Sequence, residues 1–196
     1  MNTGNKLSDR LNKKVNKLFI TKRGSQAAVE DINSTVGLFY MIQAHFRPDF
    51  EMVEVGSFEG TSTLMFALFV KKVYSVDCYD YKVPETGRIP SHDRLFQRAE
   101  KTFLRRTAKV PNISKIRKTS IEAAKDFEDE SLDAVYIDAE HDEESVRTDI
   151  QTWLPKVKKG GYLSGHDWWL PHIEKLVRGL NREIQIYQDS SWIVKK

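Results

Sequence analysis

The sequence predicts an α/β fold with a doubly wound, mainly parallel sheet. Short apolar runs alternate along the chain with segments whose apolar residues recur at helical spacing, a pattern typical of parallel strands joined by helices. The chain has 196 residues, 40% of them hydrophobic, which is enough for one domain with its own core. We therefore expect a single domain over residues 25–196, preceded by a basic helix or extension over residues 1–24.

Seven apolar runs have the length and composition of strands. The last two are separated by residues 188–191 alone, too few for a parallel crossover, so this pair is predicted to form an antiparallel hairpin. In chain order, the predicted strands are 52–56, 73–77, 113–117, 134–138, 162–164, 184–187 and 192–194.

Five segments outside these runs carry helical periodicity. In the first, Ala28, Ile32, Val36 and Phe39 fall on one face that can pack on a sheet. Gly160-Gly161 is predicted to make the turn into the fifth strand. The predicted helices are 27–46, 61–69, 92–106, 143–154 and 173–181.

Composition indicates a cytoplasmic protein without a membrane anchor. Cys78 is the only cysteine, so no intrachain disulfide can form and a reducing compartment is expected. The first residues lack the apolar core of a signal peptide, and no apolar run approaches the roughly 18 residues needed to span a bilayer.

The net charge is only +3, but basic residues gather near the start of the chain and again at 156–159. Solvated surface lysines are the favoured interpretation, with contact to nucleic acid or another anionic partner as the alternative. No aromatic RNA-binding motif accompanies the clusters, so nucleic acid is not expected as a partner. The early cluster comprises Lys13, Lys14, Lys17, Lys22 and Arg23.

Ligands of open α/β sheets bind at the carboxyl ends of the strands, near the point where strand order reverses. The first such loop has Gly56 and Gly60 before a predicted helix, so that its backbone N–H groups can face a ligand. Glu54 and Glu59 would repel a pyrophosphate. They suit S-adenosylmethionine, a sulfonium cation with an ammonium group and no phosphate.

Asp77 ends the second predicted strand, about twenty residues after Glu54. A carboxylate at this spacing can accept hydrogen bonds from both ribose hydroxyls of an adenosine. The alternative is an ordinary strand-end aspartate that caps a loop.

Four motifs together resemble the class I S-adenosylmethionine-dependent methyltransferases, specifically the small group related to sugar and macrolide O-methyltransferases. The resemblance covers residues 37–194 and implies a Rossmann-like, seven-stranded sheet with an antiparallel last strand. It also implies methyl transfer to a hydroxyl oxygen of a small molecule or sugar. The motifs are Glu54-x-Gly56-x-x-x-Gly60-x-Ser62, Val76-Asp77, Tyr136-Ile137-Asp138-Ala139-x-His141 and Gly160-Gly161-Tyr162-Leu163-x-Gly165-His166-Asp167.

The same resemblance assigns the cofactor contacts. The methionine part would lie on the first loop, the ribose on the end of the second strand, and the adenine beside the residues that follow the third strand. The assigned residues are Glu54, Gly56, Ser57, Gly60, Thr61 and Ser62 for the first loop, Asp77 and Cys78 for the second, and Ser120 and Ile121 for the third.

The resemblance also places Asp138 beside the reacting methyl group; the alternative is that Asp138 caps the helix beginning near Asp142. His141 and His166 are candidate bases for the acceptor hydroxyl, because histidine titrates near pH 6.5. Either could instead be a structural histidine. Together with Asp167, these residues are predicted to form one catalytic cluster at the ends of the fourth and fifth strands.

Metal-dependent relatives place Asp-Asp or Asp-Asn after the fifth strand, where this chain has His166-Asp167. Magnesium prefers oxygen ligands, whereas imidazole suits zinc, nickel or iron. A divalent metal on Asp138 and Asp167 therefore stays an alternative to a metal-free mechanism.

Other functions remain open at this point. A methyltransferase that acts on nucleic acid or protein would use the same cofactor site, as would a cofactor-binding protein that has lost catalysis. A dehydrogenase is disfavoured, because the third glycine of Gly-x-Gly-x-x-Gly is missing. The segment 78–91 is predicted to be a binding loop, with a surface insertion as the alternative. The oligomeric state, a homo-oligomer included, cannot be read from the sequence.

Overall fold

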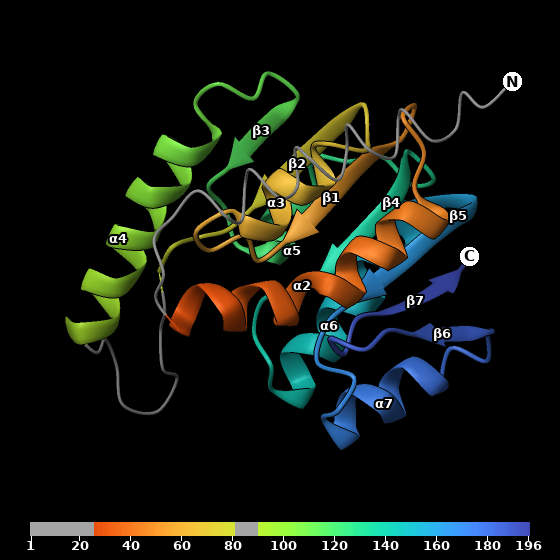
Figure 1. The fold of residues 1–196 in the computed structure, drawn as a ribbon. Helices are drawn as coiled ribbons and strands as arrows, with labels where there is room; N and C mark the ends of the chain where they lie inside the picture. Colours follow the sequence, from red (N-terminus) through yellow and green to blue (C-terminus); the bar gives the residue numbers. More distant parts are fainter. Residues whose placement is uncertain (1–25, 81–89) are drawn as a thin grey trace, which may run out of the picture.

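The computed structural model describes residues 26–80 and 90–196. The predicted basic segment over residues 1–24 and most of the predicted loop 78–91 lie outside the described residues. Figure 1 traces the described chain as one sheet with helices on both sides. The helices are α2 (Gln26–His45), α3 (Thr61–Phe66), α4 (Pro90–Thr107), α5 (Ser120–Ala124), α6 (Glu143–Trp153) and α7 (Pro171–Arg178), with a 3-10 turn η1 (Leu154–Lys156).

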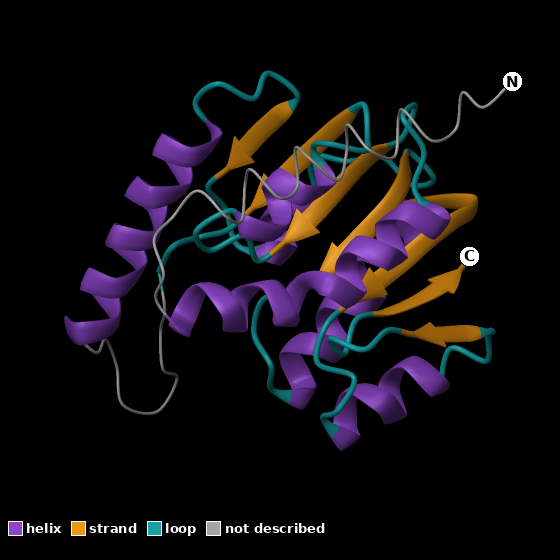
Figure 2. Ribbon diagram, viewed as in Figure 1, coloured by secondary structure: helices purple, strands orange, loops and turns teal. Residues whose placement is uncertain are grey.

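The sheet has seven strands in the order β3-β2-β1-β4-β5-β7-β6. Neighbours from β3 to β5 are parallel, and β7 is antiparallel to both β5 and β6. The predicted fold class, including the antiparallel last strand, is confirmed (Figure 2). The strands are β1 (Glu51–Val55), β2 (Lys72–Val76), β3 (Ile113–Ile116), β4 (Leu132–Ile137), β5 (Val157–Gly165), β6 (Ile184–Ile186) and β7 (Trp192–Lys195).

The prediction was wrong at the start of β5. Gly160 and Gly161 lie inside this strand, not in a turn before it. The register between β4 and β5 shifts at this point, so β5 bulges there. Gly160 has a φ of 80°, a conformation that glycine adopts without a steric penalty.

Helix α5 was missed by the sequence analysis, although a local signal for it exists. The Thr119 hydroxyl oxygen accepts a hydrogen bond from the Glu122 amide, and the Glu122 side chain accepts one from the Thr119 amide. This reciprocal capping box is a known start signal for helices. Helix α5 has only five residues, too few to show helical periodicity in the sequence.

Each face of the sheet carries its own hydrophobic core. On one face, Val53, Val135 and Leu163 pack with Ile150 and Trp153 of α6. On the other, Met52, Ala134 and Tyr136 pack with residues of α2 and α3. The alternation of side chains along each strand directs them to the two cores in turn.

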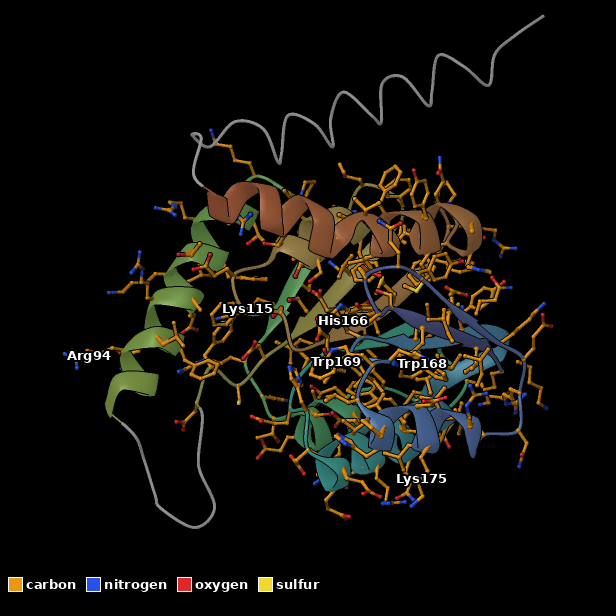
Figure 3. All side chains as sticks on the ribbon, turned by 60° about the horizontal axis from the view of Figure 1, so that its bottom comes forward. Arg94, Lys115, His166, Trp168, Trp169 and Lys175 are labelled. Atoms are coloured by element: carbon orange, nitrogen blue, oxygen red, sulfur yellow. The ribbon has the colours of Figure 1, made fainter. Side chains whose placement is uncertain are left out.

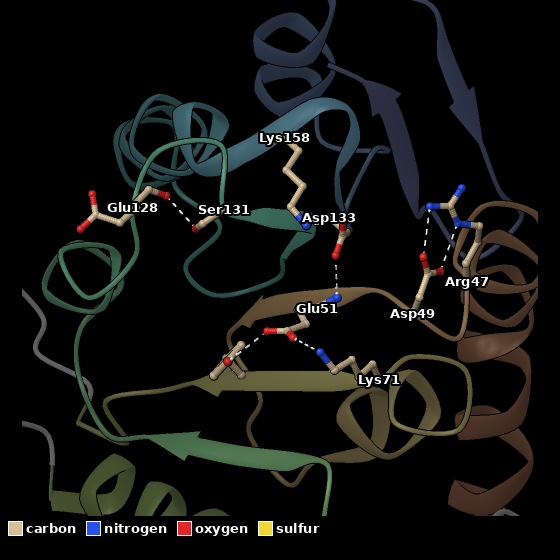
Figure 4. A network of polar contacts seen from close by, with 9 residues as sticks. Arg47, Asp49, Glu51, Lys71, Glu128, Ser131, Asp133 and Lys158 are labelled. Carbon is tan, nitrogen blue, oxygen red and sulfur yellow. Dashed lines mark hydrogen bonds and ion pairs between the residues drawn. The ribbon is translucent and has the colours of Figure 1, made fainter.

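The amino ends of the strands are held by polar contacts, shown in Figure 4. Asp133 accepts the backbone N–H of Glu51 at 2.8 Å and pairs with Lys158 at 2.7 Å. Glu51 pairs in turn with Lys71 at 2.6 Å. Because these partners satisfy one another, this edge is structural, and the carboxyl edge carries the unusual chemistry.

Over residues 26–80 and 90–196, no helix is both long enough and apolar enough to cross a membrane.

Candidate functional site

The candidate site lies where the carboxyl ends of β1, β4 and β5 meet. These strands are neighbours, and the chain turns from β1 toward β2 on one side and from β4 toward β5 on the other. This reversal of strand order is the usual position of a ligand in open α/β sheets. Phe58, Tyr79 and Asp167, in the loops at this edge, have positive φ angles, and such costly backbone conformations often mark functional sites.

Gly56 brings the β1–α3 loop directly against the end of β4. Its φ is 87°, and a Cβ at this position would overlap the carbonyl group of Asp138 and lie 2.7 Å from Ala139 Cα. Only glycine permits this approach. The predicted cofactor loop and the predicted catalytic aspartate are therefore in backbone contact.

Gly60 has a different reason for being glycine. A Cβ there would lie 2.8 Å from Cδ2 of Phe103, a fully buried side chain of α4. Its φ of 78° adds a conformational requirement. The bare face of Gly60 is thus covered by core packing, which the glycine spacing alone did not reveal.

Asp77 organises the loop through backbone contacts. Its Oδ2 accepts hydrogen bonds from the amides of Ser57 at 3.1 Å and Phe58 at 2.8 Å, and its Oδ1 accepts one from Tyr79 at 2.7 Å. The structure therefore supports the loop-capping alternative directly. The ribose contact stays a prediction.

Glu54 is fully buried beneath the loop. Its Oε2 accepts a hydrogen bond from the Thr63 hydroxyl, whereas Oε1 has no hydrogen-bond partner. Burial raises the pKa of Glu54 to about 8, against the opposing effect of hydrogen bonds from Ser62 and Thr63. A buried acceptor without a donor is costly, and a ligand ammonium would satisfy it.

Three other residues assigned to the cofactor already have protein partners. Thr61 Oγ1 accepts a hydrogen bond from Arg106 at 2.9 Å, and Cys78 Sγ donates to the Asp80 carbonyl at 3.3 Å. Ser120 donates to Asp149 and accepts from Trp153 Nε1 at 2.8 Å. Their polar atoms are therefore engaged in holding the loops.

Two further assigned residues differ in their exposure. Ser57 is buried, with its hydroxyl 3.4 Å from the Tyr79 hydroxyl. Ile121 is 49% exposed at the start of α5. Ile121 thus presents an apolar surface to solvent, and its contact with adenine stays a prediction.

The four residues assigned to catalysis lie together. His141 Nε2 is 3.5 Å from Asp167 Oδ2, and His166 Nδ1 is 3.1 Å from Asp167 Oδ1. All four residues line one hollow. Asp142, not Asp138, caps α6 through the amides of Glu144 and Ser145. The capping alternative for Asp138 is therefore wrong.

The charges around His166 change its expected role. Burial alone would lower its pKa, but the hydrogen bond to Asp167 and the charge of Asp138 outweigh this and raise the pKa to about 9. His166 is then an imidazolium at neutral pH and cannot accept a proton there. The hypothesis that His166 is the base is therefore not supported by its surroundings.

The two aspartates of the cluster differ in their proton affinity. Burial raises the pKa of Asp138 to about 6, although His166 opposes the shift. Burial acts in the same direction on Asp167, but its contacts with His166 and His141 prevail and lower its pKa. A carboxylate that titrates close to neutral pH suits a general base. Asp138 and His141 are thus the remaining candidates.

Ligand atoms of Asp138, His141 and Asp167 lie within 4.8 Å of one another, close enough to share one metal ion. Two carboxylates and one imidazole form a mixed donor set, less suited to magnesium than to a transition metal. Asp167, however, already accepts contacts from His166 and Trp169. Two of the three possible ligands, His141 and Asp167, are thus already paired within the protein.

Two residues at this edge were not predicted from the sequence. Asp189 is buried in the loop between β6 and β7 and accepts hydrogen bonds from the amides of Leu38, at 2.6 Å, and Ser191, at 3.0 Å. It thereby fastens α2 beside the site. Trp169 follows the cluster on the loop from β5 to α7 and is 68% exposed. The signal in the sequence that could have identified Trp169 is its position, two residues after the candidate catalytic residue Asp167.

Comparison with known proteins gives a consistent picture. The model of a family described as a methyltransferase domain matches residues 53–168. An uncharacterised protein of Sinorhizobium fredii is 36% identical over 52 residues, which are 26% of this chain and 6% of that protein. This chain thus spans only a small part of that relative.

Solved structures with the same fold include an rRNA methylase from Streptococcus thermophilus, which has a TM-score of 0.57 at 13% identity and covers 80% of this chain and 91% of its own. A candidate methyltransferase from Streptococcus mutans, in complex with S-adenosylhomocysteine, has a TM-score of 0.56 at 13% identity. The match covers 80% of this chain and 93% of the other. At these identities the likeness concerns the fold alone.

Proposed function

This chain belongs to the methyltransferase-domain family, and from that premise we propose that it transfers a methyl group from S-adenosylmethionine to a hydroxyl oxygen of a small molecule or sugar. The observation that carries the proposal is the contact between Gly56 and the end of β4. Through it, the loop that would hold the cofactor adjoins Asp138, His141, His166 and Asp167.

The residues present fit this cofactor. Glu54 offers a buried oxygen without a donor, and the ammonium of the methionine part is a donor of the right charge. Ser57 and Phe58 have their amides turned toward Asp77, which fixes the loop before a ligand arrives. Support also comes from the neighbour of the same fold that is in complex with S-adenosylhomocysteine.

When bound, the cofactor would supply an electrophilic methyl group and, as the bond between sulfur and the methyl carbon breaks, would leave as S-adenosylhomocysteine. The task of the protein is to align the acceptor oxygen and take its proton. Asp138 accepts that proton, directly or through His141, while the bond between oxygen and the methyl carbon forms. His166, as an imidazolium, donates a hydrogen bond to Asp167 and keeps it ionised. Alignment alone can supply up to roughly 7 to 11 kcal/mol of the barrier.

Two measurements test the proposal. Calorimetry with S-adenosylhomocysteine, and with NAD as the competing cofactor class, establishes which is bound; we expect only the former to bind. A screen of hydroxylated acceptors with labelled S-adenosylmethionine then follows transfer. Binding without transfer to any acceptor, sugars and nucleic acids included, would indicate a cofactor-binding protein that has lost catalysis.

A further inference from the structure

Trp169 is the most exposed of the large hydrophobic side chains in the described part of the chain, at 68%. A single exposed hydrophobic residue is ordinary. Trp169, however, is hydrogen-bonded to the cluster formed by Asp138, His141, His166 and Asp167, because its indole Nε1 donates to Asp167 Oδ1 at 3.3 Å. Figure 3 shows Trp169 beside His166 on the face turned forward.

The backbone around Trp169 is fixed on both sides. Asp167 has a φ of 60°, and its carbonyl accepts the amide of Leu170 at 2.9 Å. The amide of Trp168 donates to the Ser190 carbonyl at 3.1 Å. The centre of the Trp168 ring lies 5.3 Å from the guanidinium carbon of Arg178. Trp168 therefore packs inward, and Trp169 is held outward at a defined place.

The surroundings of Trp169 indicate what could lie on its ring. The hollow next to it is lined by Asp138, Glu140, His141 and Asp167, all groups that form hydrogen bonds with hydroxyls. A flat aromatic acceptor would gain most from apolar walls on both faces. A pyranose ring has one face of C–H groups, which pack on an aromatic ring, and hydroxyls around its edge.

We propose that Trp169 is the platform on which a pyranose acceptor stacks, with its hydroxyl edge directed at Asp138 and His141. This inference rests on the proposed function and narrows its acceptor to a cyclic sugar. The ring sets the plane of the sugar, and the hydrogen bond to Asp167 sets the orientation of the ring. Trp169 thus determines acceptor binding and leaves the cofactor loop unaffected.

The tryptophan fluorescence of the whole chain provides the first test. Trp169 is the most exposed of the four tryptophans, since Trp153 and Trp192 are buried and Trp168 is half-buried. Because Trp192 also lines the hollow, the change is assigned to Trp169 by its loss in the Trp169→Leu variant. With S-adenosylhomocysteine bound, methyl pyranosides of glucose, galactose, mannose and rhamnose are titrated against sorbitol, an acyclic polyol. We expect a saturable change with at least one pyranoside and none with sorbitol.

Variants separate stacking from support of Asp167. Trp169→Phe keeps an aromatic face but loses the Nε1 donor, whereas Trp169→Leu loses the face. We expect Trp169→Leu to raise the acceptor KM at least tenfold and Trp169→Phe to raise it less than threefold, both with unchanged affinity for S-adenosylhomocysteine. Tyr40→Ala, which removes another exposed aromatic side chain, is the matched control.

Three outcomes would contradict the proposal that Trp169 is a stacking platform. The first is a wild-type acceptor KM for Trp169→Leu. The second is an equal fall of kcat in both variants at constant KM, which would mean that Trp169 only supports Asp167. The third is a response to a flat aromatic such as catechol and to no pyranoside, with S-adenosylhomocysteine bound. If S-adenosylhomocysteine itself does not bind, the proposed function is contradicted. If it binds but one of these three outcomes is found, only the role of Trp169 is contradicted.

Discussion

Glu54 provides the sharpest prediction, because its surroundings link cofactor binding to a proton. With a pKa of about 8, about ten carboxyl groups are protonated for each ionised one at pH 7. The cofactor ammonium needs the ionised form at Oε1. Binding of S-adenosylhomocysteine should therefore release about 0.9 proton at pH 7 and about half a proton at pH 8.

Calorimetry in buffers of different ionisation enthalpy measures this release. The affinity should rise about tenfold per pH unit below pH 8 and level off above it. Glu54→Gln keeps the shape of the side chain without its charge, so its release should be near zero. Glu59→Gln is the control, because Glu59 belongs to the same loop but is partly exposed; its release should match that of the wild type.

The same carboxyl group affects stability with a defined sign. The folded pKa of about 8 lies above the ordinary value of 4.5, so between these pH values the folded state binds more protons than the unfolded state. The free energy of unfolding therefore falls as pH rises, by at most about 1.4 kcal/mol per pH unit and about 5 kcal/mol in all. Glu54→Gln should lose this fall. The reasoning would be refuted if the free energy of unfolding changed with pH in the same way for the wild type and for Glu54→Gln, and if wild-type binding of S-adenosylhomocysteine released no proton.

Three further predictions concern other residues of the candidate site. Gly56→Ala should abolish S-adenosylhomocysteine binding and lower the melting temperature, because its Cβ would overlap Asp138; Gly160→Ala, with a similar φ but open space, should cost only about 1–2 kcal/mol. At saturating cofactor, kcat should fall below about pH 6 as Asp138 is protonated, and above about pH 9 as His166 loses its proton. His166→Gln should remove the alkaline fall and, because the His166 charge no longer lowers the pKa of Asp138, move the acidic fall to higher pH. Asp77→Ala should weaken binding about ten- to hundredfold, the usual worth of hydrogen bonds to a charged group.

Each of these has a contradicting result. Equal melting temperatures for the two glycine variants would mean that the approach to Asp138 does not need glycine. An unchanged alkaline limb in His166→Gln would assign that limb to another group. If Asp77 holds the loop, hydrogen exchange at the amides of Ser57, Phe58 and Tyr79 should accelerate in Asp77→Ala; unchanged protection would leave Asp77 without that role.

The sequence by itself determined the layout of the fold. Strand periodicity, helical spacing and the four-residue gap before Trp192 are local properties, and local patterns suffice to place the strands to within a few residues at most ends. The main error, at Gly160 and Gly161, arose because a bulge depends on the register with the neighbouring strand. The parallel topology then brought the loop residues to one edge, as the order of elements predicts.

Only the tertiary structure decided what each side chain at that edge does. Asp77 holds the loop because the amides of Ser57 and Phe58 fold back onto it. The pKa of His166 is raised by the hydrogen bond to Asp167, the next residue, and by the charge of Asp138 at the end of the neighbouring strand. Proton affinity and ligand access depend on charges, donors and burial from residues distant in the chain. Sequence spacing carries none of these quantities, and for that reason it identified the candidate residues but not their roles.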